Sequence, residues 1–594
     1  MDENISNKIS DLRAIMQKNG VQFLIIPTSD PHLSEYVADH WKSRAWITGF
    51  TGSAGTAVIS TNEAGLWTDS RYFLQAEEQL AGSGITLYKE GIAGTPSINE
   101  WICSKANAGA CIGIDGERFS ANDVAQMQQT LDRHGLHLKC DASFINELWH
   151  DAPALPQSAL FPLDIQYAGE SLSDKLARTR AFIKKSQANA LLITALDEVA
   201  WTFNLRASDV DFNPVAIAYA IVYENSAALF TDCHRISDEG KMIFKNANVE
   251  LLPYDYIYKV LNDLPKSTKI IVDKCKANYA LTHSIDQENI VEGSSPITFM
   301  KSIKNEVEVA GIRKAVVKDG VAMAYAFRWL EECVKSGQKV TEMDFAEKLY
   351  QCRSQQANFF CESFGTIAGY GRHGAIVHYS ATEESNAVIG QESLLLVDSG
   401  ANYFDGTTDI TRTIIIGLPS QQQKIDYTNV LKGHIALASI QFPQGTHGAQ
   451  LDVLARQFLW NAGEDYGHGT GHGIGHFLCV HEGPQNIRIR DNGTELQKGM
   501  LISNEPGLYK TGQYGIRTEN MVLVQEGETT EFGRFLQFET LSLFPFDSKL
   551  IEISMLNEKE RNWINQYHRK VWDKISPLLD EETQKWLAQK VKTI

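Results

Sequence analysis

The sequence predicts a mixed α/β protein built from more than one domain. Its 594 residues exceed the roughly 250 to 300 at which a single hydrophobic core stops growing. A content of 43% hydrophobic and 22% charged residues is ordinary for a globular protein. Amphipathic helices followed by apolar β-runs recur before about residue 300, whereas strands separated by Gly-rich turns follow it. These observations predict two α/β domains and a third domain of different construction.

The first α/β domain begins near the N-terminus. Residues 5–16 carry apolar side chains at helical spacing, the pattern stops at Asn19-Gly20, and the run VQFLIIP then predicts a buried strand. The polar residues within this segment argue against the apolar core of a signal peptide.

A second α/β domain of the same kind follows. Residues 176–194, LARTRAFIKKSQANALLIT, again predict an amphipathic helix and a buried strand. Related sequences, LWTDSR at 66–71 and LFTDCHR at 229–235, follow the two helices at a similar distance. We therefore expect a duplicated domain, with a boundary near PALPQSALFP at 153–162, where three prolines cluster.

A long helix over residues 302–337 is predicted to open the third domain. Strands such as LLLVDSG, TRTIIIG and MVLV then alternate with helices such as 421–441. From about residue 553, Trp563, Trp572 and Trp586 stand among charged residues. They predict terminal helices that pack on this domain or on a partner.

Composition excludes several classes of protein. Fifty-five Lys and Arg against 73 Asp and Glu give a net charge of −18, which repels nucleic acid and anionic lipid. No apolar run approaches the roughly 18 to 20 residues that span a bilayer. The nine cysteines form no C-x-x-C pair, which disfavours a disulfide framework and a zinc ribbon. We expect a cytoplasmic protein that binds neither nucleic acid nor membrane.

Two aspartates flank a Gly-Thr-Thr turn in DSGANYFDGTTDITRT, residues 398–413. Asp398 ends the apolar run LLLV, and Asp409 begins the β-branched run ITRTIII. A strand, a turn and a second strand would bring both carboxylates to one face of a hairpin. Because aspartate is a common turn former, the pair alone favours a solvated turn over a site.

A histidine cluster follows in YGHGTGHGIGH, residues 466–476. His468 and His472 are four residues apart, as in helical zinc motifs, but glycines at 467, 469, 471 and 473 disfavour a helix. We expect a turn or an extended segment, in which glycine lets the backbone pack closely against a site. With His481 nearby, the cluster favours chemistry over a purely structural role.

Two glutamates and an arginine lie in NEPGLYKTGQYGIRTENMVLV, residues 504–524. Glu505 precedes Pro-Gly, and Glu519 lies in a later β-run. Strand alternation places Arg517 and Glu519 on one face, where Arg517 would hold an acidic ligand by a charge-assisted hydrogen bond. A surface salt bridge is the alternative.

Two Asp, two Glu and one His offer hard oxygen donors with one imidazole. Such a set suits Mn²⁺, Co²⁺, Fe²⁺ or Zn²⁺ better than Ca²⁺ or a thiolate-bound zinc. If the four carboxylates converged without metal, burial and repulsion would make each costly to ionise. Four carboxylates balance two divalent ions, which can share a hydroxide and polarise a carbonyl. Convergence would therefore imply a dinuclear hydrolytic site.

The motifs VDSGANYFDGTTDITRT, YGHGTGHGIGHFLCVHEGP and NEPGLY…GIRTEN resemble, in order and spacing, those of the pita-bread metallopeptidases of family M24. GFTGSAGTAVIS…LWTDSRYFLQAEEQL at 49–80 and the two preceding α/β domains resemble the three-domain cytosolic Xaa-Pro aminopeptidases. The resemblance covers nearly the whole chain. It implies two creatinase-like α/β domains, 1–158 and 159–300, followed by a pita-bread catalytic domain, 301–594, with a C-terminal helical extension.

This resemblance also implies roles for individual residues. The implied metal ligands, with Asp409 and Glu519 bridging two divalent ions, are Asp398, Asp409, His472, Glu505 and Glu519. The implied catalytic residues are Glu505, His378, His468, His481 and Arg517, and the three histidines also bind substrate. Arg71 matches a residue that reaches a substrate in the neighbouring active site of a homodimer. Mn²⁺ is the expected ion, with Zn²⁺ or Co²⁺ as alternatives, and His476 is expected to be structural.

The implied activity releases the N-terminal residue from peptides with proline in second position. In this hypothesis Glu505 accepts a proton from the attacking water and His468 stabilises the oxyanion, while His378 and His481 bind the peptide. A prolidase-type dipeptidase and a non-catalytic peptide-binding module are the alternatives. Prolidases usually have one N-terminal domain, and the binding modules lack several ligands, whereas all five are present in this sequence.

Overall fold

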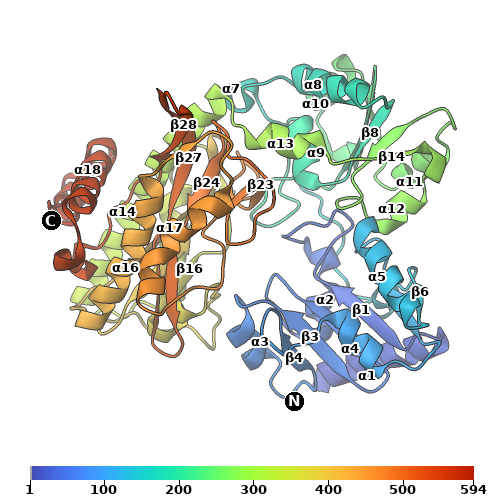
Figure 1. The fold of residues 1–594 in the computed structure, drawn as a ribbon, viewed down its shortest axis with the longest axis horizontal. Helices are drawn as coiled ribbons and strands as arrows, with labels where there is room; N and C mark the ends of the chain where they lie inside the picture. Colours follow the sequence, from blue (N-terminus) through green and yellow to red (C-terminus); the bar gives the residue numbers. More distant parts are fainter. Residues whose placement is uncertain (1–2) are drawn as a thin grey trace. The chain divides into compact units, whose positions relative to one another are not determined.

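The computed structural model describes residues 3–594, which divide into two compact units (Figure 1). The first unit runs up to Asp164 and resumes for Glu170–Ile297, and the second comprises Ile165–Gly169 and Thr298–Ile594. In the described part of the chain, no helix is both long enough and apolar enough to traverse a bilayer.

The first unit contains two six-stranded sheets of identical topology. From one edge to the other, successive strand pairs in each are parallel, antiparallel, antiparallel, parallel and parallel. The first sheet has the order β4 (Thr86–Lys89), β3 (Ala64–Thr68), β2 (Thr56–Ser60), β1 (Phe23–Pro27), β5 (Cys111–Ile114) and β6 (His137–Lys139). The second has the order β12 (Val249–Leu252), β11 (Ala227–Phe230), β10 (Tyr219–Tyr223), β8 (Ala190–Ile193), β13 (Ile270–Val272) and β14 (Ile290–Glu292). This shared topology confirms the predicted duplication.

Side chains alternate along β1, so successive residues enter two different cores, one on each face of the first sheet. Leu24 and Ile26 join one core with α1 (Glu3–Lys18), whereas Phe23 and Ile25 join another with α4 (Ile98–Lys105) and α5 (Ala121–Arg133). The chain leaves α1 through Gly20 at φ 69°, a left-handed conformation that glycine adopts without strain. The other helices of this half are α2 (Ser43–Thr48), α3 (Phe73–Gln79) and α6 (Phe144–Leu148).

The second sheet repeats the predicted helix and strand as α8 (Leu172–Lys185) and β8. LWTDSR and LFTDCHR end β3 and β11, which occupy equivalent places in the two sheets. The other elements of this half are α9 (Leu196–Thr202), α10 (Asp238–Asn246), α11 (Tyr256–Asn262), α12 (Tyr279–His283) and the paired short strands β7 (Phe161–Pro162) and β9 (Leu205–Arg206).

The second unit contains α14 (Glu306–Lys335), the long helix predicted over 302–337. It begins later than predicted because Asn305 is extended and caps it, accepting hydrogen bonds from the backbone of Val307 and Glu308. The residues before this cap form a separate helix, α13 (Pro296–Ser302). A further short helix of this unit is α7 (Ile165–Ala168).

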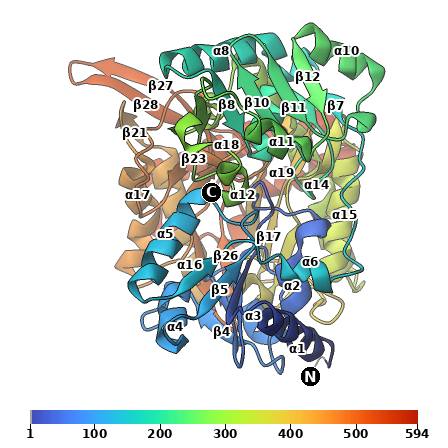
Figure 2. The ribbon, with the colours of Figure 1, turned by 90° about the vertical axis from the view of Figure 1, so that its right-hand side faces the viewer.

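Strands of the second unit form four sheets. The largest, whose long β27–β28 hairpin reaches past its neighbours in Figure 2, has the order β21 (Gln441–Pro443), β28 (Gly533–Thr540), β27 (Asn520–Thr530), β24 (Leu501–Asn504), β22 (Gly471–Gly473) and β23 (Glu482–Ile487). The smaller sheets contain β16 (Ile367–Tyr370), β17 (Leu395–Ser399) and β20 (Ile410–Ile414); β15 (Phe359–Glu362), β18 (Ala401–Tyr403) and β19 (Gly406–Thr407); and β25 (Gly507–Lys510) with β26 (Tyr514–Arg517).

Helices of the second unit surround a large apolar core. They include α15 (Glu342–Ser354), α16 (Gln421–Ala438), α17 (Gly448–Asn461), α18 (Glu558–Ile575) and α19 (Glu581–Lys590). The helix predicted over 421–441 is therefore confirmed as α16. The terminal helices α18 and α19 contact α14, and their tryptophans pack on this core, so of the two predicted alternatives they cover their own unit.

Candidate metal centre

Asp398 and Asp409 are brought together by two strands that pair directly. Asp398 lies in β17 opposite Thr411 of β20, and Asp409 immediately precedes β20. The predicted pairing is correct, but the connection is not a simple turn. Between the two strands the chain forms β18 and β19, which pair with each other in a different sheet. Both aspartates are buried.

His472 lies in the extended strand β22, as the glycine pattern predicted. A Cβ added at Gly471 would approach the Ser503 carbonyl oxygen to 2.0 Å, and one at Gly473 the Glu482 carbonyl oxygen to 2.1 Å, so neighbouring strands pass too close for any other residue. Nδ1 of His472 contacts the Gly473 carbonyl at 2.9 Å, which places the lone pair on Nε2 when Nδ1 donates. Imidazole binds a metal ion through such a lone pair.

Glu505 and Glu519 complete the acidic group. His472 Nε2 lies 3.4 Å from Glu505 Oε1 and 3.5 Å from Asp409 Oδ2. The Thr411 hydroxyl donates to Glu519 Oε2 at 2.6 Å. One donor atom each from Asp409, His472 and Glu519 can lie within 4.8 Å of one another, a grouping suited to a metal ion.

Arg517 holds an acidic residue of this group, Asp398, as expected. The predicted alternation along one strand is wrong, because Arg517 ends β26 and Glu519 lies between β26 and β27. Arg517 Nη2 donates to Asp398 Oδ2 at 2.7 Å, and its Nε lies 3.2 Å from the same oxygen. Nη1 donates to the Tyr509 hydroxyl at 2.6 Å, and that hydroxyl lies 2.8 Å from His468 Nε2. The Arg517 and Asp398 side chains are 2% and 12% exposed, so this ion pair is not on the surface.

Burial and mutual repulsion raise the pKa values of three of the carboxyl groups. Burial raises the pKa of Glu505 to about 7, with Asp398 adding to the shift and Arg517 opposing it. The pKa values of Asp409 and Glu519 also rise, first through burial and then through neighbouring carboxylates. The side chain of Glu505 is 16% exposed, compared with 5% for that of Asp409, so Glu505 is the more accessible of the two.

The donor set fits divalent metal ions. Two carboxylate oxygens, Asp398 Oδ1 and Glu519 Oε1, are buried and have no hydrogen-bond donor among residues 3–594. A buried acceptor without a donor is costly, and a cation would satisfy both atoms. Arg517 contributes one positive charge against four carboxylates. Oxygen donors with one imidazole match Mn²⁺, Co²⁺, Fe²⁺ or Zn²⁺.

The three predicted substrate-handling histidines lie near members of this group. The ring of His481 packs on that of His472, with centroids 4.4 Å apart and planes perpendicular. His378 follows Val377, whose carbonyl accepts from Arg517 Nη2 at 3.3 Å. His468 contacts the Gly469 carbonyl through Nδ1 at 2.8 Å and Tyr509 through Nε2. Their roles stay predictions.

The segment beginning at His481 is anchored by a buried ion cluster. The Glu482 carboxylate accepts from Lys301 at 2.7 Å and from Lys304 at 2.6 Å, and all three side chains are 1% exposed. Glu482 also opens β23, which pairs with the strand of His472. The cluster therefore fixes the backbone next to two of the predicted site residues.

Two other predicted residues contact partners outside this group. His476 is buried, with Nδ1 3.9 Å from Glu308 Oε1 of α14, as expected for a structural histidine. Arg71 belongs to the first unit, where its Nε and Nη2 each donate to an Asp69 oxygen at 2.8 Å. Its predicted part in a neighbouring active site stays a prediction.

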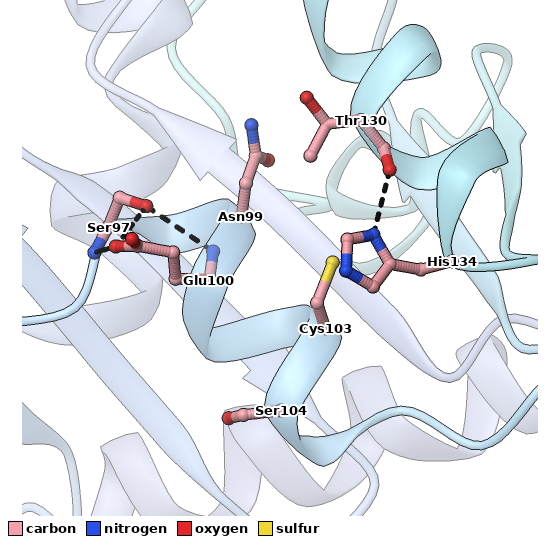
Figure 3. A pocket seen from close by; sticks show the side chains of 7 residues that line it. All are labelled: Ser97, Asn99, Glu100, Cys103, Ser104, Thr130 and His134. Carbon is pink, nitrogen blue, oxygen red and sulfur yellow. Dashed lines mark hydrogen bonds between the residues drawn. The ribbon is translucent and has the colours of Figure 1, made fainter.

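A shallow pocket in the first unit contains none of the predicted residues (Figure 3). Its lining residues are Ser97, Asn99, Glu100, Cys103, Ser104, Thr130 and His134. Ser97 and Glu100 bind each other in a helix cap, and His134 contacts the Thr130 carbonyl at 3.0 Å. Burial raises the pKa of the Cys103 thiol, which disfavours a reactive thiolate.

Comparison with known proteins places the chain in a family. The family model of metallopeptidase family M24 matches residues 310–526, and that of the C-terminal region of peptidase M24 matches 534–594. Models of the creatinase/prolidase N-terminal domain match 8–142 and 151–308. A probable Xaa-Pro aminopeptidase P from Laccaria bicolor is 40% identical over 601 residues, which cover 99% of this chain and 93% of that protein. The chain belongs to metallopeptidase family M24.

Two other relatives also match this M24 chain over nearly its whole length. Aminopeptidase P2 of Arabidopsis thaliana is 41% identical to this chain. The alignment covers 98% of this chain and 88% of the Arabidopsis protein. The crystal structure of X-prolyl aminopeptidase from Caenorhabditis elegans, described as a cytosolic enzyme with a di-nuclear active site, is 33% identical, with a TM-score of 0.96 over 100% of both chains. The predicted fold class is confirmed, since two creatinase-type domains precede the M24 domain.

Sequence reasoning missed several polar residues that orient the site of this M24 chain. Thr411 bonds Glu519 and lies 3.3 Å from Arg517 Nε, Tyr509 links Arg517 to His468, and Ser503 donates to Glu505 at 3.1 Å. Of these residues, only Thr411 could have been found from the sequence. Side chains alternate along the strand ITRT, so Thr411 and Arg412 point to opposite faces of the sheet.

Proposed function

We propose that this chain is an Xaa-Pro aminopeptidase, which releases the N-terminal residue from peptides with proline in second position. One observation carries the proposal. Carboxylates and an imidazole from three distant motifs meet in one buried group, within a chain that matches such enzymes over nearly its whole length.

Two divalent ions are the cofactors we propose, held by Asp398, Asp409, His472, Glu505 and Glu519. The dinuclear site of the nematode enzyme and the two buried acceptors without donors support this number. Mn²⁺ is our first candidate, ahead of Zn²⁺ and Co²⁺, because carboxylate oxygens dominate the set. When bound, two such ions polarise the peptide carbonyl and lower the pKa of bound water toward neutrality.

Residues of the chain supply the remaining chemistry. Glu505 accepts the proton of the attacking water, and its position beside His472, with a side chain that is 16% exposed, suits proton transfer. Arg517 holds Asp398 in place. His468 is the candidate oxyanion donor. Both of its ring nitrogens contact protein atoms, so donation to substrate requires exchange of its Tyr509 bond. His378 and His481 bind the peptide.

Proline in second position constrains recognition. An Xaa-Pro bond has no N–H, so the site must recognise ring shape and carbonyl oxygens instead. The half-buried His378 and His481 offer such donors. Cleavage of Xaa-Pro-Yaa-Zaa between Xaa and Pro, lost on N-acetylation and on replacement of Pro by Ala, is the expected result.

Peptide length separates the alternatives. Cleavage of the Xaa-Pro dipeptide without cleavage of Xaa-Pro-Yaa-Zaa would identify a prolidase-type dipeptidase. Binding of both peptides without cleavage, in protein that elemental analysis shows to hold two ions, would identify a non-catalytic binding module. Asp409→Asn should lose metal and turnover together, and full turnover by this variant would place the site elsewhere.

Three further features belong to this proposal. We divide the chain into domains 1–158, 159–300 and 301–594, supported by separate family matches to residues 8–142, 151–308 and 310–526. We place it in the cytoplasm, where the nematode enzyme is found. We expect a homodimer in which Arg71 of one copy reaches the substrate of the other. Light scattering tests the dimer, and Arg71→Ala should raise KM more than it lowers kcat.

A further inference from the structure

A buried arginine joins the acidic group to the C-terminal extension. Arg412 lies in β20, next to Thr411, and is completely buried. Arg412 forms no ion pair with a carboxylate of residues 3–594, and its hydrogen bonds go to carbonyl, amide and hydroxyl oxygens. A buried guanidinium needs an acceptor for each of its five N–H groups, so these oxygens fix its position.

The two ends of this guanidinium bind different parts of the second unit. Nη1 donates to the carbonyl oxygens of Thr411 at 2.8 Å and Glu519 at 2.6 Å. Nη2 donates to the Phe544 carbonyl at 2.6 Å and the Tyr567 hydroxyl at 2.7 Å. Phe544 and Tyr567 both lie in the segment 534–594 that matches the C-terminal region of peptidase M24. Arg412 thus ties the backbone of a predicted ligand to that segment.

Tyr567 secures the far side of this link. It projects from α18 and is buried, and its hydroxyl lies 2.9 Å from the Ser542 carbonyl and 3.2 Å from Asn520 Oδ1. Ser542 forms a second link, since its hydroxyl accepts from the Met521 amide at 2.8 Å and lies 3.3 Å from the Asp409 carbonyl. The extension therefore reaches the backbone of both Asp409 and Glu519, the two residues predicted to bridge the ions.

We propose that the C-terminal extension, residues 534–594, sets the metal affinity of the site through Arg412 and Tyr567, which act as positioning residues. The inference rests on the proposed function, because it takes Asp409 and Glu519 as metal ligands. Donor atoms of Asp409, His472 and Glu519 lie within 4.8 Å of one another, so one cation can reach both acidic residues only while their backbones are held in place. Outer contacts that orient ligands in this way strongly affect metal affinity. Neither residue contacts a group assigned to the peptide, so peptide recognition is unaffected.

Mn²⁺ titration of the full-length, chelator-treated protein by calorimetry tests this inference. Arg412→Lys keeps the charge, but a single ammonium cannot span both ends of the link, and it should weaken Mn²⁺ binding by about 10- to 100-fold. Tyr567→Phe removes only the hydroxyl and should weaken binding less, in the same direction. Trp572→Phe is the matched control on the same helix, because Trp572 packs on the core, and it should bind Mn²⁺ like wild type.

Two further readouts separate positioning from a general loss of stability. With saturating Mn²⁺, the variants should recover turnover with an unchanged KM for an Xaa-Pro peptide. Wild-type Mn²⁺ affinity in folded Arg412→Lys and Tyr567→Phe would overturn the inference, whatever their melting temperatures. If Arg412→Lys fails to fold, Tyr567→Phe decides by the same criterion. A wild-type chain that binds no Mn²⁺ overturns the proposed metal site as well, whereas one that binds Mn²⁺ but cleaves no peptide overturns only the proposed activity.

Discussion

Removing the metal ions should make the folded chain less stable as the pH rises. Burial raises the pKa of Glu505 to about 7 from its usual 4.5. Between these values the folded state keeps a proton that the unfolded state has lost, so the free energy of unfolding falls with increasing pH. At 1.36 kcal/mol per pKa unit, the total loss is about 3 kcal/mol and is complete above the folded pKa.

Urea unfolding of chelator-treated wild type and Glu505→Gln, across the pH range from 5 to 8 that brackets this titration, measures the effect. Glutamine does not titrate, so the difference between the two proteins reports the titration of Glu505 together with its effect on Asp409 and Glu519, while the contributions of groups elsewhere cancel. One such group is His434, whose pKa burial lowers to about 3 and which gives the opposite slope, since it favours folding as the pH rises.

The wild-type advantage over Glu505→Gln should shrink as the pH rises. A difference that is flat across the range, or that grows with pH, would refute the argument that Glu505 is buried against other carboxylates. Added Mn²⁺ should remove the slope in wild type, because the cation favours the ionised form that the metal-free site resists.

Three substitutions test Arg517 and the ion cluster next to the site. Arg517→Met leaves Asp398 without its buried partner and should lower kcat/KM about 10- to 100-fold. The assay uses an Xaa-Pro peptide at saturating Mn²⁺. Unchanged turnover would show that Asp398 needs no such support. Glu482→Gln leaves two buried ammonium groups without a carboxylate and should destabilise the protein by about 3 to 5 kcal/mol in urea unfolding, whereas Lys304→Met keeps the Lys301 pair and should cost less. The reverse order of the two losses would contradict this account of the cluster.

Local patterns allowed much of the fold to be predicted. Apolar spacing located α1 and α14, and glycines at alternate positions indicated that His472 is extended. These signals are local, because helical periodicity and steric exclusion of side chains act over a few residues. The start of α14 was misplaced because an Asn cap, rather than apolar spacing, sets where a helix begins.

Contacts between distant segments were beyond prediction from the sequence. The excursion through β18 and β19 depends on pairing with β15, which no feature of the Asp398 to Asp409 segment reveals. Strand alternation indicated that Arg517 would hold an acidic ligand, but it did not indicate Asp398. The partners of Arg517, Tyr509 and Arg412 depend on how separate sheets and helices pack. Such partners are set by tertiary structure rather than by propensity.

The position of Tyr567 along the chain has a consequence for synthesis. A ribosome delivers Asp398, His472 and Glu519 before it delivers α18, so a nascent chain interrupted ahead of that helix carries the whole acidic set without the hydroxyl that braces Arg412. Such a truncated product would hold its cations poorly and would be an inert protein rather than an unregulated protease.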